Sequence, residues 1–216
     1  DKVAGVRVTL YYTIYNDQNV ILRHQKLENI GTDYFYIHNI QSMSLELPSM
    51  NWDCISFHGA HAAEANLSRF PLHHGIQRME SRRGSSSPNY QPFFSIVSPD
   101  TNVAQGEIYA MHLVYSGNFL AQAEMDQFGC VRMQIGIHPD GFIWKLDPKA
   151  VFESPEAVLV YTDQGLNGMS HIFHRLYREH LIPKQFVNQN RPVLLNSWEA
   201  MYCDVTMDKL ERQMKL

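Results

Sequence analysis

Trp198 and Glu199 are the residues of this sequence whose placement most suggests contact with a ligand. They follow the apolar run VLLN at residues 193–196, which is typical of a short buried strand. If that run is a strand of an α/β barrel, residues 196–199 lie at its carboxyl end, where such barrels build their active sites. An indole in that position offers a flat apolar face to the C–H groups of a sugar ring. The pattern alone equally allows Trp198 to belong to the barrel core.

A pair of carboxylates could hydrolyse a glycosidic bond, because glycosidases need two of them flanking the scissile bond. None of the available residues has an evident partner in the sequence, and we expect a surface role for each except Glu199. The candidate carboxylates are Asp53, Glu80, Glu124, Asp126, Glu199 and Asp204.

A charged cluster occupies the segment IQRMESRR at residues 76–83. On a strand, Arg78, Glu80 and Arg82 would share one face. They could mark a ligand or subunit edge, or they could form a cross-strand ladder of ion pairs, which is the commoner arrangement.

Histidines are numerous, and two H-x-x-H pairs stand out, His58 with His61 and His171 with His174. Zinc protease helices instead place two histidines four residues apart, with a glutamate beside the first. The three cysteines are widely spaced and show no metal-ligand pattern (Cys54, Cys130 and Cys203). We therefore predict no metal and no cofactor.

Strands must position most of these residues. Val6, Val8, Leu10, Tyr12 and Ile14 alternate with polar residues, which predicts a half-buried strand. Residues 48–75 are too irregular for a strand to be assigned. Further strands are predicted at residues 20–29, 34–47, 76–83, 93–97, 107–117, 119–127, 131–138, 142–146 and 157–162. Short strands separated by turns favour an antiparallel sandwich.

The pattern becomes helical after Asp163. Apolar residues recur at helical spacing from Leu166 to Leu181, with Asp163 or Asn167 as the expected cap and Pro183 as the end. After the VLLN strand, Thr206 is expected to cap a second helix. A single strand and helix cannot bury their own faces, so residues 191–216 are expected to belong to a larger α/β unit.

Composition excludes some classes of partner. The 216 residues carry a formal net charge of −4, which argues against nucleic acid and anionic membrane surfaces. No apolar run approaches the roughly 20 residues of a membrane-spanning helix. The cellular compartment is left open, with the cytoplasm the favoured expectation.

Four runs of this sequence resemble glycoside hydrolase family 36 α-galactosidases. They are SGNFLAQ at 116–122, DQGLNGMS at 163–170, HRLYREHL at 174–181 and RPVLLNSWEA at 191–200. Together with shorter matches they cover almost the whole chain in the family's order and spacing.

The resemblance implies a mainly β fold. Residues 1–162 would be an antiparallel β-supersandwich that lacks its opening strands, and residues 163–190 a long connecting helix and linker. Residues 191–216 would be the first strand and helix of a truncated (β/α)8 barrel.

The resemblance also implies part of a retaining α-galactosidase that hydrolyses terminal α-galactosides of the melibiose and raffinose type. Its aspartate nucleophile and aspartate acid/base are expected beyond residue 216, so this chain alone is expected to be inactive. Members of the family are often tetramers. The alternative is a non-catalytic β-sandwich module for carbohydrate binding or oligomer assembly.

One site residue carries over from the family. Its N-N-W-E-A motif matches Asn196-Ser197-Trp198-Glu199-Ala200, with Ser197 in place of the second Asn. The family's Trp lines the galactose pocket, so Trp198 is the first candidate for substrate binding, followed by Asn196 and Glu199. SPNYQ at 87–91 departs from the family's S-H-Q-H-N.

Overall fold

The computed structural model describes residues 5–49 and 51–215. The chain divides into two compact units, one ending at Leu176 and one beginning at Tyr177. No described helix is both long and apolar enough to cross a membrane.

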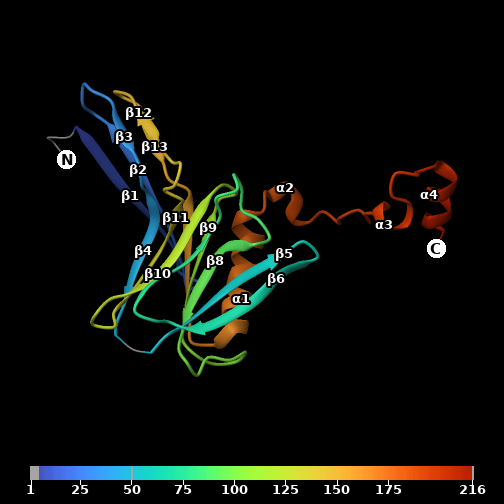
Figure 1. Cartoon of the computed structure of the whole chain (residues 1–216), viewed down its shortest axis with the longest axis horizontal. Helices are drawn as coiled ribbons and strands as arrows, with labels where there is room; N and C mark the ends of the chain where they lie inside the picture. The colour runs from blue at the N-terminus through green and yellow to red at the C-terminus, as the bar shows by residue number, and fades with distance from the viewer. Residues whose placement is uncertain (1–4, 50, 216) are drawn as a thin grey trace. The chain divides into compact units, whose positions relative to one another are not determined.

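A large antiparallel sheet forms most of the first unit (Figure 1). Its central strands are rich in Val, Ile, Phe and Tyr, residues that suit the pleated surface of a buried sheet. The strands in their order across the sheet are β1 (Val6–Tyr15), β2 (Val20–Asn29), β14 (Glu156–Thr162), β9 (Ile108–Val114), β8 (Tyr90–Val97), β5 (Asp53–Ala60) and β6 (Ala63–Pro71), with β13 (Val151–Glu153) also paired to β2.

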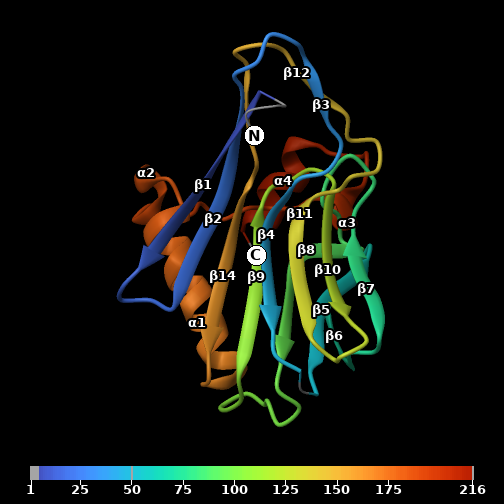
Figure 2. The same cartoon turned by 90° about the vertical axis from the view of Figure 1, so that its left-hand side faces the viewer.

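A smaller sheet covers one face of the large sheet (Figure 2). It consists of β10 (Phe119–Met125), β11 (Val131–Ile137) and β4 (Gln41–Leu47), and β7 (Gly75–Glu80) runs beside β10. Two short strands, β3 (Phe35–Ile37) and β12 (Trp144–Leu146), pair separately. The core between the sheets is apolar and fully buried, and it includes Phe94, Ile96, Met111, Phe119, Met133 and Ile135. The predicted antiparallel sandwich is therefore confirmed.

The sequence prediction missed the hairpin of β5 and β6, because residues 48–75 show no regular pattern. β6 lies at the edge of the large sheet, and most of its residues are exposed on both faces. An edge strand exposed in this way needs no alternation of apolar and polar residues, so it leaves no signal of period two. The strand predicted at 34–47 is also divided, since β3 pairs with β12 while β4 pairs with β11.

The prediction that β1 is half-buried is wrong. Of the alternating residues expected to face the core, Val8, Leu10, Tyr12 and Ile14 are exposed, from 47% for Leu10 to 64% for Ile14, and Val6 is intermediate. β1 is the edge strand and pairs with β2 only. Arg23 and Gln25 of β2 donate hydrogen bonds to the backbone carbonyls of Ser42 and Gln41 in β4. The smaller sheet therefore reaches as far as β2 and leaves β1 uncovered.

Helix α1 (Gly165–Leu176) lies against the other face of the large sheet. Its buried Phe173 contacts Phe93 at a centroid distance of 5.6 Å and His112 at 6.4 Å. Phe93 and His112 are paired across β8 and β9, and they point away from the core residues Phe94 and Met111 that follow the same register. The predicted helix is confirmed up to Leu176.

Side-chain capping of α1 by Asp163 or Asn167 was expected, and the structure uses backbone groups instead. The N–H groups of Gly165, Leu166 and Asn167 donate to the carbonyl oxygens of Gly106, Asn102 and Val103 at 3.3, 3.0 and 3.0 Å. A loop between β8 and β9 thus satisfies the donors that the first turn leaves open. Gly165 has φ +64°, and a Cβ there would lie 2.5 Å from Asn102 O and Gln105 N.

The second unit begins with a π-helical turn, η1 (Tyr177–Leu181), and continues with α2 (Lys184–Val187), α3 (Trp198–Met201) and α4 (Met207–Met214). The predicted cap of α4 is confirmed, since Thr206 Oγ1 accepts the N–H of Lys209 at 3.5 Å. The strand predicted at residues 193–196 is not formed, and Val193 and Leu194 are almost fully exposed. A strand needs a neighbour to satisfy its backbone, and none of the described residues provides one here.

We predict that Gly165→Ala destabilises the protein more than Gly141→Ala. Both glycines have positive φ, at +64° and +73°, so both variants incur the left-handed conformational cost of about 1–2 kcal/mol. Only Gly165 would also press a Cβ against the loop, which adds at least about 1 kcal/mol. Urea denaturation of the two variants measures the difference, and equal midpoints would contradict the close approach.

We also predict an acid-sensitive contribution from His112. Burial beneath α1 lowers its pKa to about 4, from an ordinary value of 6.5. Between these values the unfolded chain binds more protons, so the stability contributed by neutral His112 is complete above pH 6.5 and is lost as pH falls towards 4. His112→Leu should flatten the dependence of Tm on pH in this window. The exposed His61→Leu is the control and should leave the slope as in the wild type.

Candidate functional site

Residues 196–204 form a compact turn around α3. The side-chain Oδ1 of Asn196 accepts the backbone N–H of Trp198 at 3.0 Å. The N–H of Tyr202 donates to Trp198 O at 2.7 Å, and the N–H of Asp204 donates to Met201 O at 2.9 Å. Short polar side chains such as that of Asn favour this local closure. Asn196 therefore has a direct role in orienting Trp198.

The turn presents two aromatic rings to its surroundings. Trp198 is 55% exposed and Tyr202 is 63% exposed, and their rings meet edge to face at a centroid distance of 5.5 Å. Tyr202 has φ +49°, a conformation that residues other than glycine seldom adopt. The edge-to-face contact holds the indole while leaving aromatic surface open, which suits stacking against the C–H face of a sugar.

The carboxylates of this turn differ in their surroundings. Glu199 lies in the first turn of α3 and is exposed. Asp204 accepts a hydrogen bond from the ammonium group of Lys209, which neutralises its charge. The structure thus brings the three predicted site residues together, Asn196, Trp198 and Glu199. Such a group offers an apolar ring face and a hydrogen-bond acceptor side by side.

Three other candidate carboxylates have structural partners. Asp53 pairs with Arg69 at 2.7 Å, and Glu124 lies 3.8 Å from Arg132. Asp126 Oδ1 accepts the backbone N–H groups of Phe128 and Cys130, which closes the turn between β10 and β11.

Glu80 belongs to a polar cluster around the buried His138. Asp140 N–H donates to His138 Nδ1 at 3.0 Å, so Nε2 carries the proton that is donated to Glu80 at 2.9 Å. Arg82 binds both Glu80 and Asp140. Burial alone would raise the pKa of Glu80, but the hydrogen bond from His138 and the charge of Arg82 outweigh it and hold the pKa below its usual value.

This cluster corrects part of the sequence prediction. Arg78 and Glu80 lie on β7, but the strand ends at Glu80, so Arg82 does not share its face. Arg78 donates to Gln122 Oε1 of β10 at 3.2 Å. Arg78 thus contacts the neighbouring strand, whereas Glu80 and Arg82 form a branched cluster with His138 and Asp140, so the three residues do not make a ladder of ion pairs.

The two histidine pairs lie on different elements, and His58 makes a local contact. His58 Nδ1 lies 2.9 Å from Ser68 Oγ across the β5–β6 hairpin, while His171 and His174 are exposed on α1. Within residues 5–49 and 51–215, no three His, Cys, Asp or Glu side chains lie close enough together to hold a metal ion.

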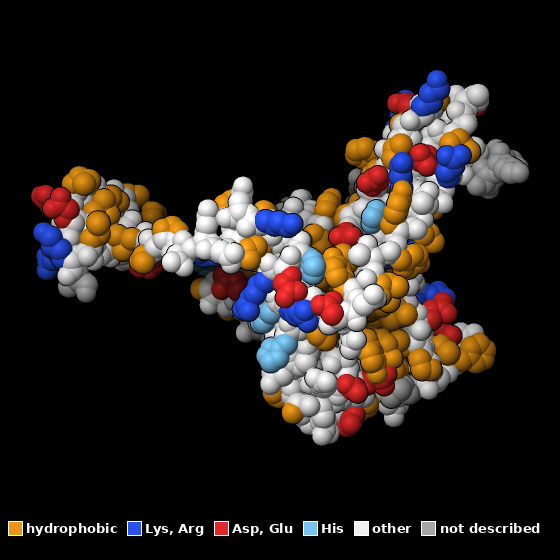
Figure 3. Space-filling view, turned by 180° about the vertical axis from the view of Figure 1, so that it is seen from behind, with side chains coloured by type: hydrophobic (Ala, Val, Ile, Leu, Met, Phe, Trp, Pro, Cys, Tyr) orange, Lys and Arg blue, Asp and Glu red, His pale blue; other side chains and the backbone are white. Residues whose placement is uncertain are grey.

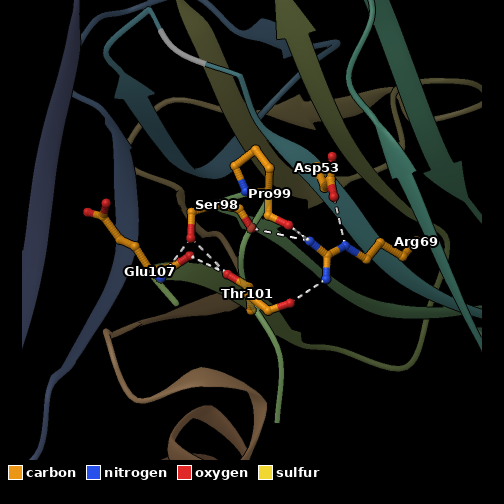
Figure 4. A network of polar contacts seen from close by, with 6 residues as sticks. All are labelled: Asp53, Arg69, Ser98, Pro99, Thr101 and Glu107. Atoms are coloured by element: carbon orange, nitrogen blue, oxygen red, sulfur yellow. Dashed lines mark hydrogen bonds and ion pairs between the residues drawn. The ribbon is translucent and has the colours of Figure 1, made fainter. Parts of the chain in front are cut away.

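Arg69 is a residue that the sequence prediction missed (Figure 4). Its guanidinium donates to Asp53 Oδ2, to Thr101 O at 2.6 Å and to Pro99 O at 2.8 Å. The only signal in the sequence was an arginine in the run NLSRFP, and its partners are 16 to 32 positions away. Such distant pairings cannot be read from local spacing.

Surface charge is mixed in sign. Acidic and basic side chains are interspersed on the face shown in Figure 3, with no extended area of one sign. The second unit exposes many apolar side chains instead, including Val193, Leu194, Trp198, Tyr202 and Met207.

Comparison with known families matches the chain in two parts. The model described as the glycosyl hydrolase family 36 N-terminal domain matches residues 1–147. The chain belongs to glycosyl hydrolase family 36. The model described as melibiase matches residues 151–215. The family resemblance of the four sequence runs is therefore confirmed.

The family 36 relatives are similar along almost the whole chain. Alpha-galactosidase AgaA of Geobacillus stearothermophilus is 45% identical over 97% of this chain and 29% of its own length. Alpha-galactosidase Mel36A of Lactobacillus acidophilus is 42% identical over 98% of this chain and 29% of its own length. The chain thus spans about 29% of the length of these relatives.

Solved structures agree with the fold. Crystal structures of AgaA variants in complex with raffinose and with stachyose match with a TM-score of 0.94 at 45% identity. Each match covers 98% of this chain and 30% of the solved chain. The sandwich and the helix that follows it are thus family 36 features.

Proposed function

We propose that this chain is part of a retaining α-galactosidase that hydrolyses terminal α-galactosides of the melibiose and raffinose type. The observation that supports this most strongly is its 45% identity to AgaA over 97% of the chain. The crystallised AgaA variants bind raffinose and stachyose, which both suit an enzyme of this substrate class.

We propose further that the two catalytic aspartates lie beyond residue 216. A retaining mechanism requires a nucleophile and an acid/base about 5–5.5 Å apart on either side of the bond. Most of the candidate carboxylates of this chain are held in structural contacts, such as Asp53 with Arg69 and Asp204 with Lys209. The chain would therefore contribute to binding and leave the chemistry to other residues.

Binding would centre on Trp198. Its exposed indole can stack on the galactose ring, and Asn196 holds its backbone N–H. The nearby carboxylate of Glu199 can accept a hydrogen bond from a sugar hydroxyl. The domain division at residues 1–162, 163–190 and 191–216 is part of the same proposal. The full-length protein is proposed to be a homo-oligomer, with a tetramer as the expected form.

Assay of the full-length protein tests this function. We expect it to hydrolyse a p-nitrophenyl α-galactoside, and proton NMR should show α-galactose as the first product because the mechanism retains configuration. Residues 1–216 alone should be inactive. Activity of this fragment would contradict the proposed location of the catalytic pair. A full-length protein without activity that still binds galactose in calorimetry would favour the non-catalytic carbohydrate-binding module.

Trp198→Ala in the full-length protein should lower kcat/KM for α-galactosides. A lost aromatic contact corresponds to about 1–3 kcal/mol of transition-state stabilisation. Trp144→Ala is the matched control, because Trp144 is also about half exposed, at 47%, but lies on β12. Unchanged kinetics in Trp198→Ala, or an equal loss in both variants, would return Trp198 to a structural role.

A further inference from the structure

We propose that Arg69 is a positioning residue for helix α1. It acts through the loop at residues 98–106, which we call the capping loop. This inference does not depend on the proposed function, because it concerns only how the sandwich holds its helix.

Helix α1 depends on the capping loop for its N-terminus. Its first turn contains no acidic residue that could balance the helix dipole. Its first N–H groups, of Gly165, Leu166 and Asn167, are all accepted by capping-loop carbonyl oxygens. In return, the N–H of Gly106 donates to Asp163 O at 3.2 Å. The position of the loop therefore decides whether the first turn of α1 is satisfied.

Polar contacts shape the capping loop, in which Ser98 and Thr101 are buried and residues 102–105 are exposed. Ser98 Oγ lies 2.9 Å from Thr101 Oγ1 and accepts the N–H of Glu107 at 3.0 Å (Figure 4). Asn102 Oδ1 accepts the N–H groups of Ala104 and Gln105 at 2.9 and 3.2 Å. The outer part of the loop is exposed, with Val103 at 57%. An exposed loop of this kind needs an anchor on the sheet.

Arg69 supplies that anchor from the edge strand β6. The two terminal nitrogens of its guanidinium donate to Thr101 O at 2.6 Å, Pro99 O at 2.8 Å and Ser98 O at 3.3 Å. Its Nε donates to Asp53 Oδ2 at 2.7 Å, so a carboxylate of β5 fixes the plane of the group. Only a planar fork with several donors can bind these oxygens together, which makes arginine the fitting residue and lysine a poor substitute.

These contacts join three separate parts of the sequence. Arg69 of the β5–β6 hairpin, held by Asp53, binds residues 98–101, and residues 102–106 bind residues 163–167. The capping loop thus links the edge hairpin to the first turn of α1, although the two do not exchange these hydrogen bonds directly.

Hydrogen exchange of the full-length protein, measured by mass spectrometry, tests this role. In Arg69→Met, the peptide covering residues 163–170 should exchange at least tenfold faster than in the wild type, while peptides of β1 and β2 remain unchanged. Arg69→Lys should give a smaller acceleration at the same peptide. Arg132→Met is the matched control, because Arg132 also binds a carboxylate, that of Glu46 at 2.7 Å, but lies on β11. In Arg132→Met, the peptide covering residues 163–170 should exchange as in the wild type.

Two results would overturn the proposal: wild-type exchange at residues 163–170 in both Arg69 variants, or an equal acceleration in Arg132→Met. If Arg69→Met does not fold, Arg69→Lys tests the proposal alone, and wild-type exchange of residues 163–170 in that variant would overturn it. The measurement requires no enzymatic activity, so its outcome and that of the α-galactosidase assay are independent of each other.

Discussion

The burial of both faces of strands β8 and β9 is the constraint on which the rest of the structure depends. Successive residues of a strand point to opposite faces, so Phe93 and Phe94 must both find apolar surroundings. Phe94 does so in the core between the sheets, and Phe93 does so beneath Phe173 of α1. Full burial of one such side chain contributes about 1.5–3 kcal/mol. The two-layer sandwich and the helix behind it are therefore parts of one packing solution.

The same physics explains the surfaces that remain apolar. β1 and residues 193–196 both have the composition of buried segments, and both are exposed. The apolar side chains alternate along β1 and are consecutive at residues 193–195, as in buried strands, but no described element lies over them. Composition reports what a segment is able to bury, whereas burial itself requires a second surface at the right place.

Polar groups connect the layers where apolar packing ends. Arg23 and Gln25 bind the edge of the smaller sheet, and Arg69 binds the capping loop. These side chains donate to backbone carbonyl oxygens that would otherwise have to be satisfied by water. The segment around Trp198 follows a different principle, since short local hydrogen bonds with Asn196 and Tyr202 hold the backbone of a residue whose indole is exposed.

Local patterns in the sequence were sufficient to predict the strands β8 to β11, helix α1 and the Thr206 cap. Alternation, helical spacing and capping all involve neighbours within a few residues. Long motifs such as RPVLLNSWEA were sufficient for the family. The tertiary structure alone decided that β1 is exposed, that β5 and β6 form an edge hairpin, and that a loop caps α1. It also decided that Glu80 binds His138, 58 positions away, and that Arg69 binds Thr101. These outcomes depend on which strand lies at an edge and which distant groups meet, and no local spacing encodes either.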